Sequence, residues 1–266
     1  MPVNNITEKE YRDQQTMFGH IGSAKDVIAW LRDTYSEGTL KEKRYRKVAY
    51  RFLDTATPYQ VLEVAAGVGD FTMFCTKLFP QHSYTANELS QVQLATNISK
   101  VAEFFGVNKL PRMSFGPVES LDLSSTSFDV IFVKASLHHF EDPRKALTEF
   151  YRVLKPGGRV VFVEDPLCLD IPFYTTWRKN NNCKAERAMG INENIYTMKE
   201  YKSFGSNFDH IEHYLDEVLV AEFDQQQSAR SGLKKIAGLL LRKFIPIFEM
   251  YMIWRFTSPV VFVFTK

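Results

Sequence analysis

Short apolar runs alternate with amphipathic stretches from residue 57 to the end of the chain. Runs that are apolar almost throughout, such as FDVIFVKA at 128–135, are typical of parallel strands that are covered on both faces. The stretches between them carry apolar residues at helical spacing. This alternation predicts an α/β fold with a doubly wound, mostly parallel sheet. Strands are expected at 57–64, 82–89, 112–116, 128–135, 159–165, within 211–223 and at 258–265, and helices at 70–79, 90–105, 143–155, 198–204 and over most of 228–256.

Two segments depart from this alternation. Residues 7–54 lack strand patterns and are expected to be helical, with a break near Ser36–Gly38. Residues 166–196 are rich in Asn, Tyr and Trp, and we expect them to form an inserted lid or a substrate-facing segment. The predicted organisation is therefore an N-terminal helical segment, 1–56, followed by one main domain, 57–266, with an insertion at about 166–196.

The composition is that of an ordinary globular protein. The chain has 266 residues, of which 45% are hydrophobic and 24% charged, so it is long enough for a large core and too apolar for a disordered chain. Its three cysteines, Cys75, Cys168 and Cys183, lack metal-ligand spacing and favour a reducing compartment, which predicts a cytoplasmic protein. The polar N-terminus and the short apolar runs predict neither a secretory signal nor a membrane span.

The formal net charge of +2 conceals two basic segments. Residues 37–51 contain six basic and two acidic residues, and residues 230–243 contain five basic residues and no acidic one. Such runs usually are solvated helix faces, and the alternative is that they approach an anionic or membrane-associated acceptor. The second segment continues into FIPIFEMYMIW, for which packing on the sheet is favoured over a peripheral contact with a membrane surface.

The candidate chemistry lies in VLEVAAGVGDFT at 61–72, where the first expected strand turns into a helix. Gly67 and Gly69 lack a Cβ, so the backbone can turn tightly there and a ligand can lie against it. The N-terminus of the following helix favours an anionic group. Glu63 can accept from an amino group, and Glu88 ends the second strand, where a carboxylate can hold both hydroxyls of a ribose. A plain tight turn would also explain the two glycines.

Four further blocks follow this loop at matching spacing, namely NEL (87–89), GPVESLDL (116–123), FDVIFVKASLHHFEDP (128–143) and EFYRVLKPGGRVVFVEDP (149–166). With these blocks the chain resembles the class I, Rossmann-like S-adenosylmethionine-dependent methyltransferases. The closest resemblance is to the broad group that includes the ubiquinone and menaquinone C-methyltransferases and many small-molecule methyltransferases. It covers about residues 59–166 and implies a seven-stranded sheet with an antiparallel last strand, S-adenosylmethionine as cofactor and S-adenosylhomocysteine as product.

The resemblance also assigns cofactor-binding residues. Ala65 stands at the first glycine of the family's loop, and Pro117 stands where an acid commonly meets the adenine amino group. Glu119 or a backbone carbonyl can take over that contact. By position, the methionine part of the cofactor lies near Glu63, Ala65, Gly67 and Gly69, the ribose on Glu88, the adenine between Leu89 and Val118–Glu119, and the sulfonium near Lys134 and His139.

A catalytic base is needed only when the acceptor must lose a proton in the reaction. The candidates by position are His138 and His139 after the fourth strand and Glu164 and Asp165 after the fifth, because both loops lie at the carboxyl edge of the sheet. We select His139 and Asp165. The alternatives are that the histidines only pack or hydrogen-bond locally, and that Asp165 only fixes the turn.

Two further assignments rest on the resemblance. In similar proteins an N-terminal helical segment folds over the cofactor as a lid, which adds Tyr11 to the candidate catalytic residues, with core packing as the alternative. No metal is expected, because a metal-dependent catechol-type site would carry a carboxylate after the fourth strand, where Lys134 stands.

The sequence therefore predicts an enzyme that transfers a methyl group from S-adenosylmethionine to a small-molecule acceptor or to a lipid- or carrier-linked one. One alternative is a methyltransferase-like fold that uses the cofactor without methylating, as a cyclase or isomerase, or that only binds a partner. A nucleic-acid methyltransferase is less favoured, because KASL at 134–137 replaces the Asn/Asp-Pro-Pro-Tyr tetrapeptide that handles a base. We therefore expect no nucleic-acid partner.

Overall fold

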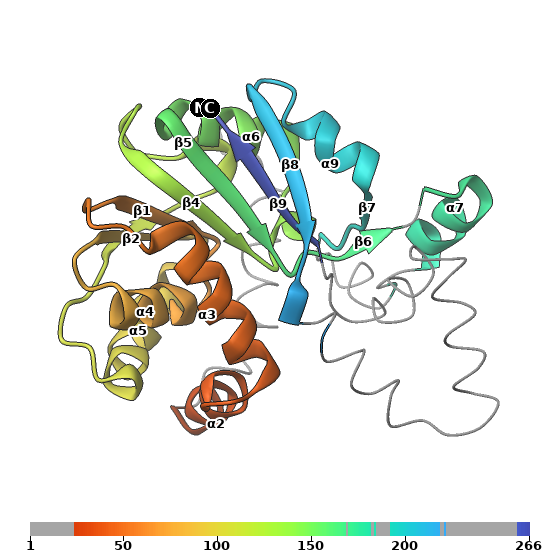
Figure 1. The fold of residues 1–266 in the computed structure, drawn as a ribbon. Helices are drawn as coiled ribbons and strands as arrows, with labels where there is room; N and C mark the ends of the chain where they lie inside the picture. Colours follow the sequence, from red (N-terminus) through yellow and green to blue (C-terminus); the bar gives the residue numbers. More distant parts are fainter. Residues whose placement is uncertain (1–23, 169, 182–183, 185–191, 219–220, 222–259) are drawn as a thin grey trace, which may run out of the picture.

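The computed structural model describes residues 24–168, 170–181, 184, 192–218, 221 and 260–266. In this part of the chain, a seven-stranded sheet carries helices on both faces (Figure 1). The strand order is β3-β2-β1-β4-β5-β9-β8, and only β9 runs antiparallel to its neighbours, which confirms the predicted fold class. The strands are β1 (Gln60–Val64), β2 (Ser83–Glu88), β3 (Arg112–Phe115), β4 (Phe128–Lys134), β5 (Leu154–Val163), β8 (His210–Leu215) and β9 (Val260–Thr265).

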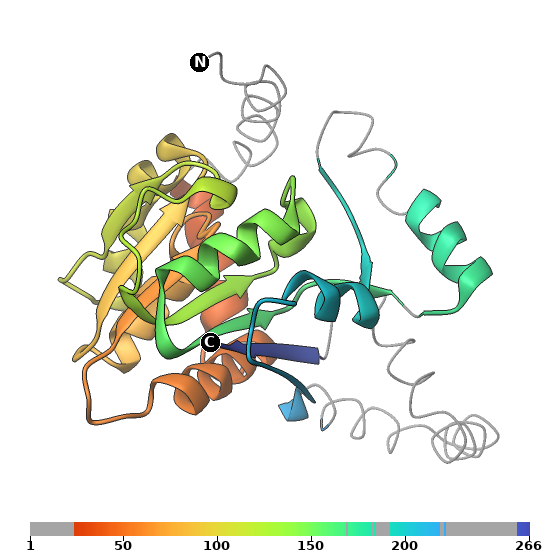
Figure 2. The ribbon, with the colours of Figure 1, turned by 90° about the horizontal axis from the view of Figure 1, so that it is seen from above.

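The central strands β1 and β4 are mostly apolar because both faces of the sheet are covered there. In β1, Val61 packs with the N-terminal helices, and its neighbour Leu62 packs on the opposite face of the sheet. Val130 and Ile131 of β4 divide in the same way. The helices that cover the first face are α2 (Ala24–Tyr35), α3 (Leu40–Leu53), α4 (Asp70–Leu78) and α5 (Gln91–Phe105), and those on the second face are α6 (Pro143–Val153) and α9 (Met198–Phe204) (Figure 2).

Local signals set most of the helix ends. The predicted break near Ser36–Gly38 separates α2 from α3. The side chain of Asp142 accepts hydrogen bonds from the amides of Arg144 and Lys145, and Pro143 is the first residue of α6, as expected. The loops that follow β1 and β4 lie together at the carboxyl edge of the sheet, because these two strands are parallel.

The KPGG sequence at 155–158 separates the expected helix 143–155 from the expected strand 159–165. Helix α6 ends at Val153, just before this sequence, and β5 begins at Leu154, earlier than expected. The pairing between β4 and β5 shifts register between Phe128 and Val130, so the extra residues of β5 are accommodated as an irregularity. Gly157 has a φ of +77°, the left-handed conformation of a turn, and its amide donates to the carbonyl of Lys266.

Four of the six basic residues at 37–51 are exposed, as a solvated helix face predicts, and Arg44 is the buried exception. The Arg44 side chain is 1% exposed, and its Nη1 and Nε atoms lie 2.5 and 2.6 Å from carboxylate oxygens of Glu164 and Asp216. Arg46 pairs with Glu42 on the same helix. The segment therefore ties α3 to the ends of β5 and β8.

The insertion forms a small unit beside the sheet. Its two-stranded sheet pairs β6 (Leu167–Cys168) with β7 (Tyr196–Thr197), and α7 (Pro172–Asn181) lies between them in the chain. None of the side chains of α7 is buried, and both ribbon views show this helix standing away from the main sheet (Figures 1 and 2). Tyr11 and the basic segment 230–243 lie outside the described residues. Among the residues that are described, no helix combines the length and apolarity needed to cross a membrane.

Candidate active site

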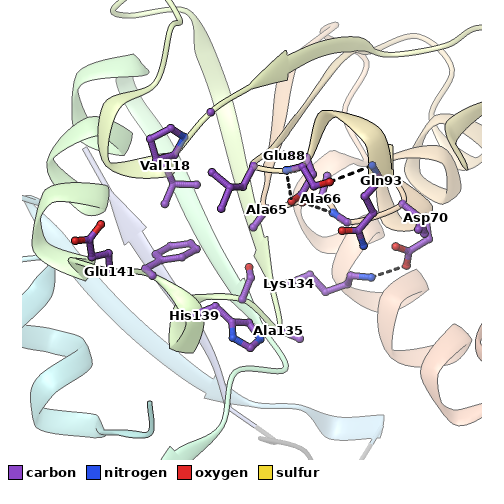
Figure 3. Close-up of a pocket in the computed structure, with 18 of the residues that line it drawn as sticks. Ala65, Ala66, Asp70, Glu88, Gln93, Val118, Lys134, Ala135, His139 and Glu141 are labelled. Carbon is purple, nitrogen blue, oxygen red and sulfur yellow. Dashed lines mark hydrogen bonds and ion pairs between the residues drawn. The ribbon is translucent and has the colours of Figure 1, made fainter. Parts of the chain in front are cut away.

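A cavity of about 280 Å³ opens at the carboxyl edge of the sheet, where the strand order reverses between β1 and β4 (Figure 3). This is the place at which doubly wound sheets bind their ligands, because the loops after neighbouring strands diverge there. The walls come from the loops after β1, β2, β3 and β4 together with α2. They are formed by Trp30, Ala65, Ala66, Gly67, Val68, Asp70, Glu88, Leu89, Ser90, Gln93, Gly116, Pro117, Val118, Glu119, Lys134, Ala135, Ser136, His139, Phe140 and Glu141.

The loop after β1 has a left-handed backbone at three of its positions. Gly67 and Gly69 have φ angles of +60° and +80°, and Ala65, which replaces the family's first glycine, has a φ of +49°. A side chain in this region costs about 1–2 kcal/mol, so the loop holds Ala65 in a strained conformation beside the cavity. Ala65 and Gly67 line the cavity, whereas Gly69 lies behind it and precedes α4.

Replacing Gly69 with Ala is expected to lower the free energy of unfolding by about 3 kcal/mol. The new Cβ would keep the unfavourable φ and would lie 2.3 Å from Ile98 Cδ1, inside the core. Gly106→Ala is the matched control, because Gly106 has a φ of +67° but nothing within 4 Å of a Cβ. Chemical denaturation should therefore show a loss of only about 1 kcal/mol for the control. Equal losses in the two variants would contradict the proposed clash.

Glu88 joins the ends of β1 and β2 at the cavity wall. Its Oε2 atom accepts from the amide of Gly67 at 2.6 Å, and its Oε1 atom accepts from the amide of Ser90 at 3.2 Å. The residue is 8% exposed, and burial raises the pKa of its carboxyl group, which the amides partly offset. The remaining lone pairs of this carboxylate are the acceptors that a ribose diol requires. Its contact with a ribose remains a prediction.

Glu63 is not among the residues that line the cavity. Its Oε2 atom accepts from the amide of Thr72 at 2.8 Å and from the hydroxyl of the same residue, so Glu63 caps the N-terminal turn of α4 from β1. Burial raises the pKa of Glu63 to about 8, against the opposing effect of Lys134. The Oε1 atom has no hydrogen-bond partner among the described residues. A direct contact of Glu63 with the cofactor remains a prediction.

Lys134 lies inside the cavity wall at the end of β4 and extends toward Asp70 (Figure 3). Its ammonium nitrogen is 2.5 Å from Asp70 Oδ2 and lies 5.6 and 5.4 Å from the ring centres of Trp30 and Tyr45. Burial lowers the pKa of Lys134, but the carboxylates of Asp70 and Glu63 outweigh burial and raise it overall. Lys134 therefore stays charged and is neutralised by Asp70 before any ligand binds.

The residues that the resemblance assigns to the adenine border the cavity, and their contact with an adenine remains a prediction. Leu89, Pro117, Val118 and Glu119 all border the cavity, and Val118 lies on the opposite side of it from Asp70 (Figure 3). Glu119 Oε1 already accepts from the amides of Glu141 and Asp142, at 2.9 and 3.2 Å. Burial raises the pKa of this carboxyl group. An adenine amino group would therefore compete with these backbone amides for Glu119, and its recognition by Glu119 remains a prediction.

The candidate catalytic residues occupy different places. His139 lines the cavity, and burial together with His138 lowers the pKa of its imidazole to about 3, so the ring is neutral at pH 7. Asp165 lies behind it, with Oδ1 at 2.8 Å from His138 Nδ1, so it orients His138 rather than facing the cavity. Tyr11 lies outside the described residues. The roles of all three in catalysis remain predictions.

Several lining residues were not predicted from the sequence. Asp70 immediately follows the glycine loop, so its place at the start of α4 was the signal that could have identified it. Trp30 comes from α2, outside every motif, whereas Ser136 lies in the block at 128–143, where no feature of the sequence singles it out. Only the packing of α2 across the edge of the sheet brings Trp30 to Lys134.

The lining fits S-adenosylmethionine in shape and charge. The left-handed turn at Gly67 lets a ligand approach the backbone, and Glu88 presents a carboxylate beside it. Four acidic side chains border the cavity against one lysine and a neutral histidine, which suits the sulfonium and ammonium charges of this cofactor. Leu89, Val118 and Phe140 provide the apolar surfaces for an adenine ring.

Comparisons with known proteins agree with this geometry. Residues 62–162 match the family described as "Methyltransferase domain". The demethylmenaquinone methyltransferase of Bacteroides fragilis is 32% identical over 164 residues, which are 61% of this chain and 64% of that protein. The ubiquinone/menaquinone biosynthesis C-methyltransferase UbiE of Geotalea daltonii is 31% identical over 60% of this chain and 65% of its own length. The chain thus spans less than two thirds of these relatives.

The solved structures that resemble the chain show the same fold. Phosphoethanolamine N-methyltransferase 2 of Haemonchus contortus, in complex with S-adenosyl-L-methionine, has a TM-score of 0.59 at 16% identity, covering 96% of this chain and 60% of that one. The [4+2]-cyclase SpnF has a TM-score of 0.61 at 15% identity, covering 94% of both chains. Residues 62–162 thus match a methyltransferase domain, and they lie in the Rossmann-like fold that these solved structures share.

Proposed function

We propose that the protein is an enzyme that transfers a methyl group from S-adenosylmethionine to a small-molecule acceptor. The observation that carries this proposal is the cavity at the carboxyl edges of β1, β2 and β4, which combines the glycine turn, Glu88 and an acidic lining in one place. The cofactor, when bound, supplies an electrophilic methyl group on a sulfonium. The chain has to align the acceptor with that group and exclude water.

The residues of the chain divide these tasks. Glu88 and the turn at Gly67 hold the cofactor, and the Lys134–Asp70 pair closes the wall that continues from β4 into α4. Trp30 and Tyr45 pack near the Lys134 ammonium and shield it from water. Where the acceptor must lose a proton, His139 is the imidazole that already faces the cavity.

We further propose that the acceptor is hydrophobic, in line with a lipid- or carrier-linked molecule. Three large side chains of the insertion are strongly exposed, with Ile171 at 52%, Phe173 at 92% and Trp177 at 57%. Arg178 follows Trp177 in the sequence and belongs to the same helix, α7, none of whose side chains is buried. An exposed apolar group beside a cation suits a substrate with an acyl or prenyl chain, or the lipid surface that holds it.

The test combines cofactor binding with product labelling, using the full chain. Calorimetry should show binding of S-adenosylmethionine and S-adenosylhomocysteine with a Kd of about 1–10 μM. Labelled methyl donor should then transfer to reduced demethylmenaquinone or to a component of a lipid extract from the source cells, and not to RNA or DNA. No heat with either cofactor form would refute the proposal. Binding without labelling of any small molecule would indicate that the cofactor is used without methylation.

A further inference from the structure

A cluster of two histidines and one glutamate lies at the rim of the cofactor cavity. His138 and His139 belong to the short helix η3 (Leu137–His139) after β4, and Glu193 comes from the insertion. Ligand-capable atoms of these three residues lie within 4.8 Å of one another. The sequence could not show this group, because the fold alone brings Glu193 to the histidines.

Both imidazoles are held in the way that metal-binding histidines usually are. His138 Nδ1 lies 2.8 Å from Asp165 Oδ1, and His139 Nδ1 lies 2.9 Å from the backbone carbonyl of Asn192. Because a carbonyl only accepts, His139 Nδ1 carries the hydrogen and Nε2 carries the lone pair. A carboxylate at His138 favours the same tautomer. Metal-ligating histidines typically donate their second nitrogen to a carboxylate or a backbone carbonyl in this manner.

The segment that carries Glu193 is fixed to the histidine turn on both sides. The amide of Asn194 donates to the carbonyl of His138 at 3.0 Å. The side-chain amide of Asn192 donates to the carbonyls of His139 and Phe140, at 3.0 and 2.5 Å. Glu193 is therefore positioned by hydrogen bonds of its two neighbours, so a ligand set at this place would be preorganised.

The charge balance of the cluster favours a cation. Asp165 is 5% exposed, and its Oδ2 atom has no hydrogen-bond partner among the described residues. Glu193 adds a second carboxylate, 3.6 Å from His139 Nδ1. Two carboxylates beside two imidazoles are costly to bury unless a positive charge accompanies them. A divalent cation supplies that charge and bonds to the imidazoles as well.

We propose that His138, His139 and Glu193 bind a divalent first-row transition-metal cation, with Asp165 as the residue that orients His138. Two imidazoles and one carboxylate suit Zn²⁺, which would keep an open position for an oxygen atom of the acceptor. Bonds of about 2.1 Å place two ligand atoms no more than about 4.2 Å apart. The Glu193 carboxylate, now 3.6 Å from His139 Nδ1, would have to rotate toward the Nε2 side of the ring to complete the group. This site shares His139 with the wall of the cofactor cavity, and its binding of a metal can be measured without methyl transfer.

The test is a titration of the chelator-treated full chain with Zn²⁺, followed by Co²⁺ for its visible absorption. One Zn²⁺ should bind per chain with a Kd of about 1 μM or tighter. His139→Asn and Glu193→Gln should each weaken binding about 100-fold, and Asp165→Asn about 10-fold. His210→Asn, at an exposed histidine on β8, is the matched control and should bind as the parent chain does.

Two results would overturn the proposal. One is Zn²⁺ binding that is the same in His139→Asn, Glu193→Gln and the parent chain, since the ion would then occupy other residues. The other is binding in the millimolar range with no visible band for Co²⁺. Circular dichroism of each variant confirms that it is folded, and the titration needs neither the cofactor nor an acceptor. Its failure therefore leaves the methyltransferase proposal to be judged by its own experiment.

Discussion

Replacing Glu88 with Gln is expected to weaken the binding of S-adenosylmethionine about 100-fold, and Glu88→Ala more. The carboxylate holds the amides of Gly67 and Ser90, and its remaining lone pairs are the acceptors available for a ribose diol. A hydrogen bond to a charged group contributes about 1.5–3 kcal/mol, and the amide of Gln keeps only one acceptor oxygen. The variant thus loses the negative charge and one of the two oxygen acceptors available to the two ribose hydroxyls. This loss corresponds to about two orders of magnitude in Kd.

Calorimetry with both forms of the cofactor measures this effect. Glu103→Gln is the matched control, because Glu103 is exposed on α5, and it should leave the Kd unchanged. Thermal melting without ligand separates loss of binding from loss of the Gly67 contact in the fold. If Glu88→Gln binds the cofactor within about threefold of the parent chain, the ribose does not lie on this residue.

Most of the helices and strands could be predicted because their sequence signals are local. Helix α6 begins at Pro143 with Asp142 as its cap, and α9 covers the predicted residues 198–204. The start of β5 could not be placed, because it depends on a hydrogen bond from Gly157 to Lys266 and on the register of β4. The glycine still marks a turn, since Gly157 has a φ of +77°, although residues on either side of it pair with β4.

Some residues of the candidate site could likewise be predicted from the sequence, and others could not. Glu88 and Gly67 are found from the sequence because the ends of consecutive parallel strands meet at one edge of the sheet. Glu63 also lies at such an end, yet its side chain turns to cap α4, and no pattern distinguishes the two directions. Residues such as Trp30 and Glu193 come from the N-terminal helices and the insertion, so only the packing of these segments reveals them.

Replacing Arg44 with Met is expected to lower the free energy of unfolding by about 3–5 kcal/mol. The guanidinium lies between Glu164 and Asp216, and the side chains of all three residues are at least 94% buried. Met fills a similar volume but leaves two carboxylates without their counter-charge in the interior. Tyr45 also donates to Glu164, and the amide of Val218 donates to Asp216 Oδ1 at 3.1 Å, so both carboxylates keep a hydrogen bond but lose the charge of Arg44. The cost is therefore that of buried carboxylates without the Arg44 charge rather than that of a cavity.

Two variants separate this explanation from a general effect of the basic segment. Lys47→Met removes an ion pair with Glu217 whose side chains are 50% and 68% exposed, so it should cost less than about 1 kcal/mol. Arg44→Lys keeps the charge but cannot reach two carboxylates with separate nitrogens, and it should fall between the two. Chemical denaturation gives all three values. A loss for Arg44→Met as small as that for Lys47→Met would mean that the carboxylates find water, and that the Arg44 ion pairs contribute little to joining α3 to β5 and β8.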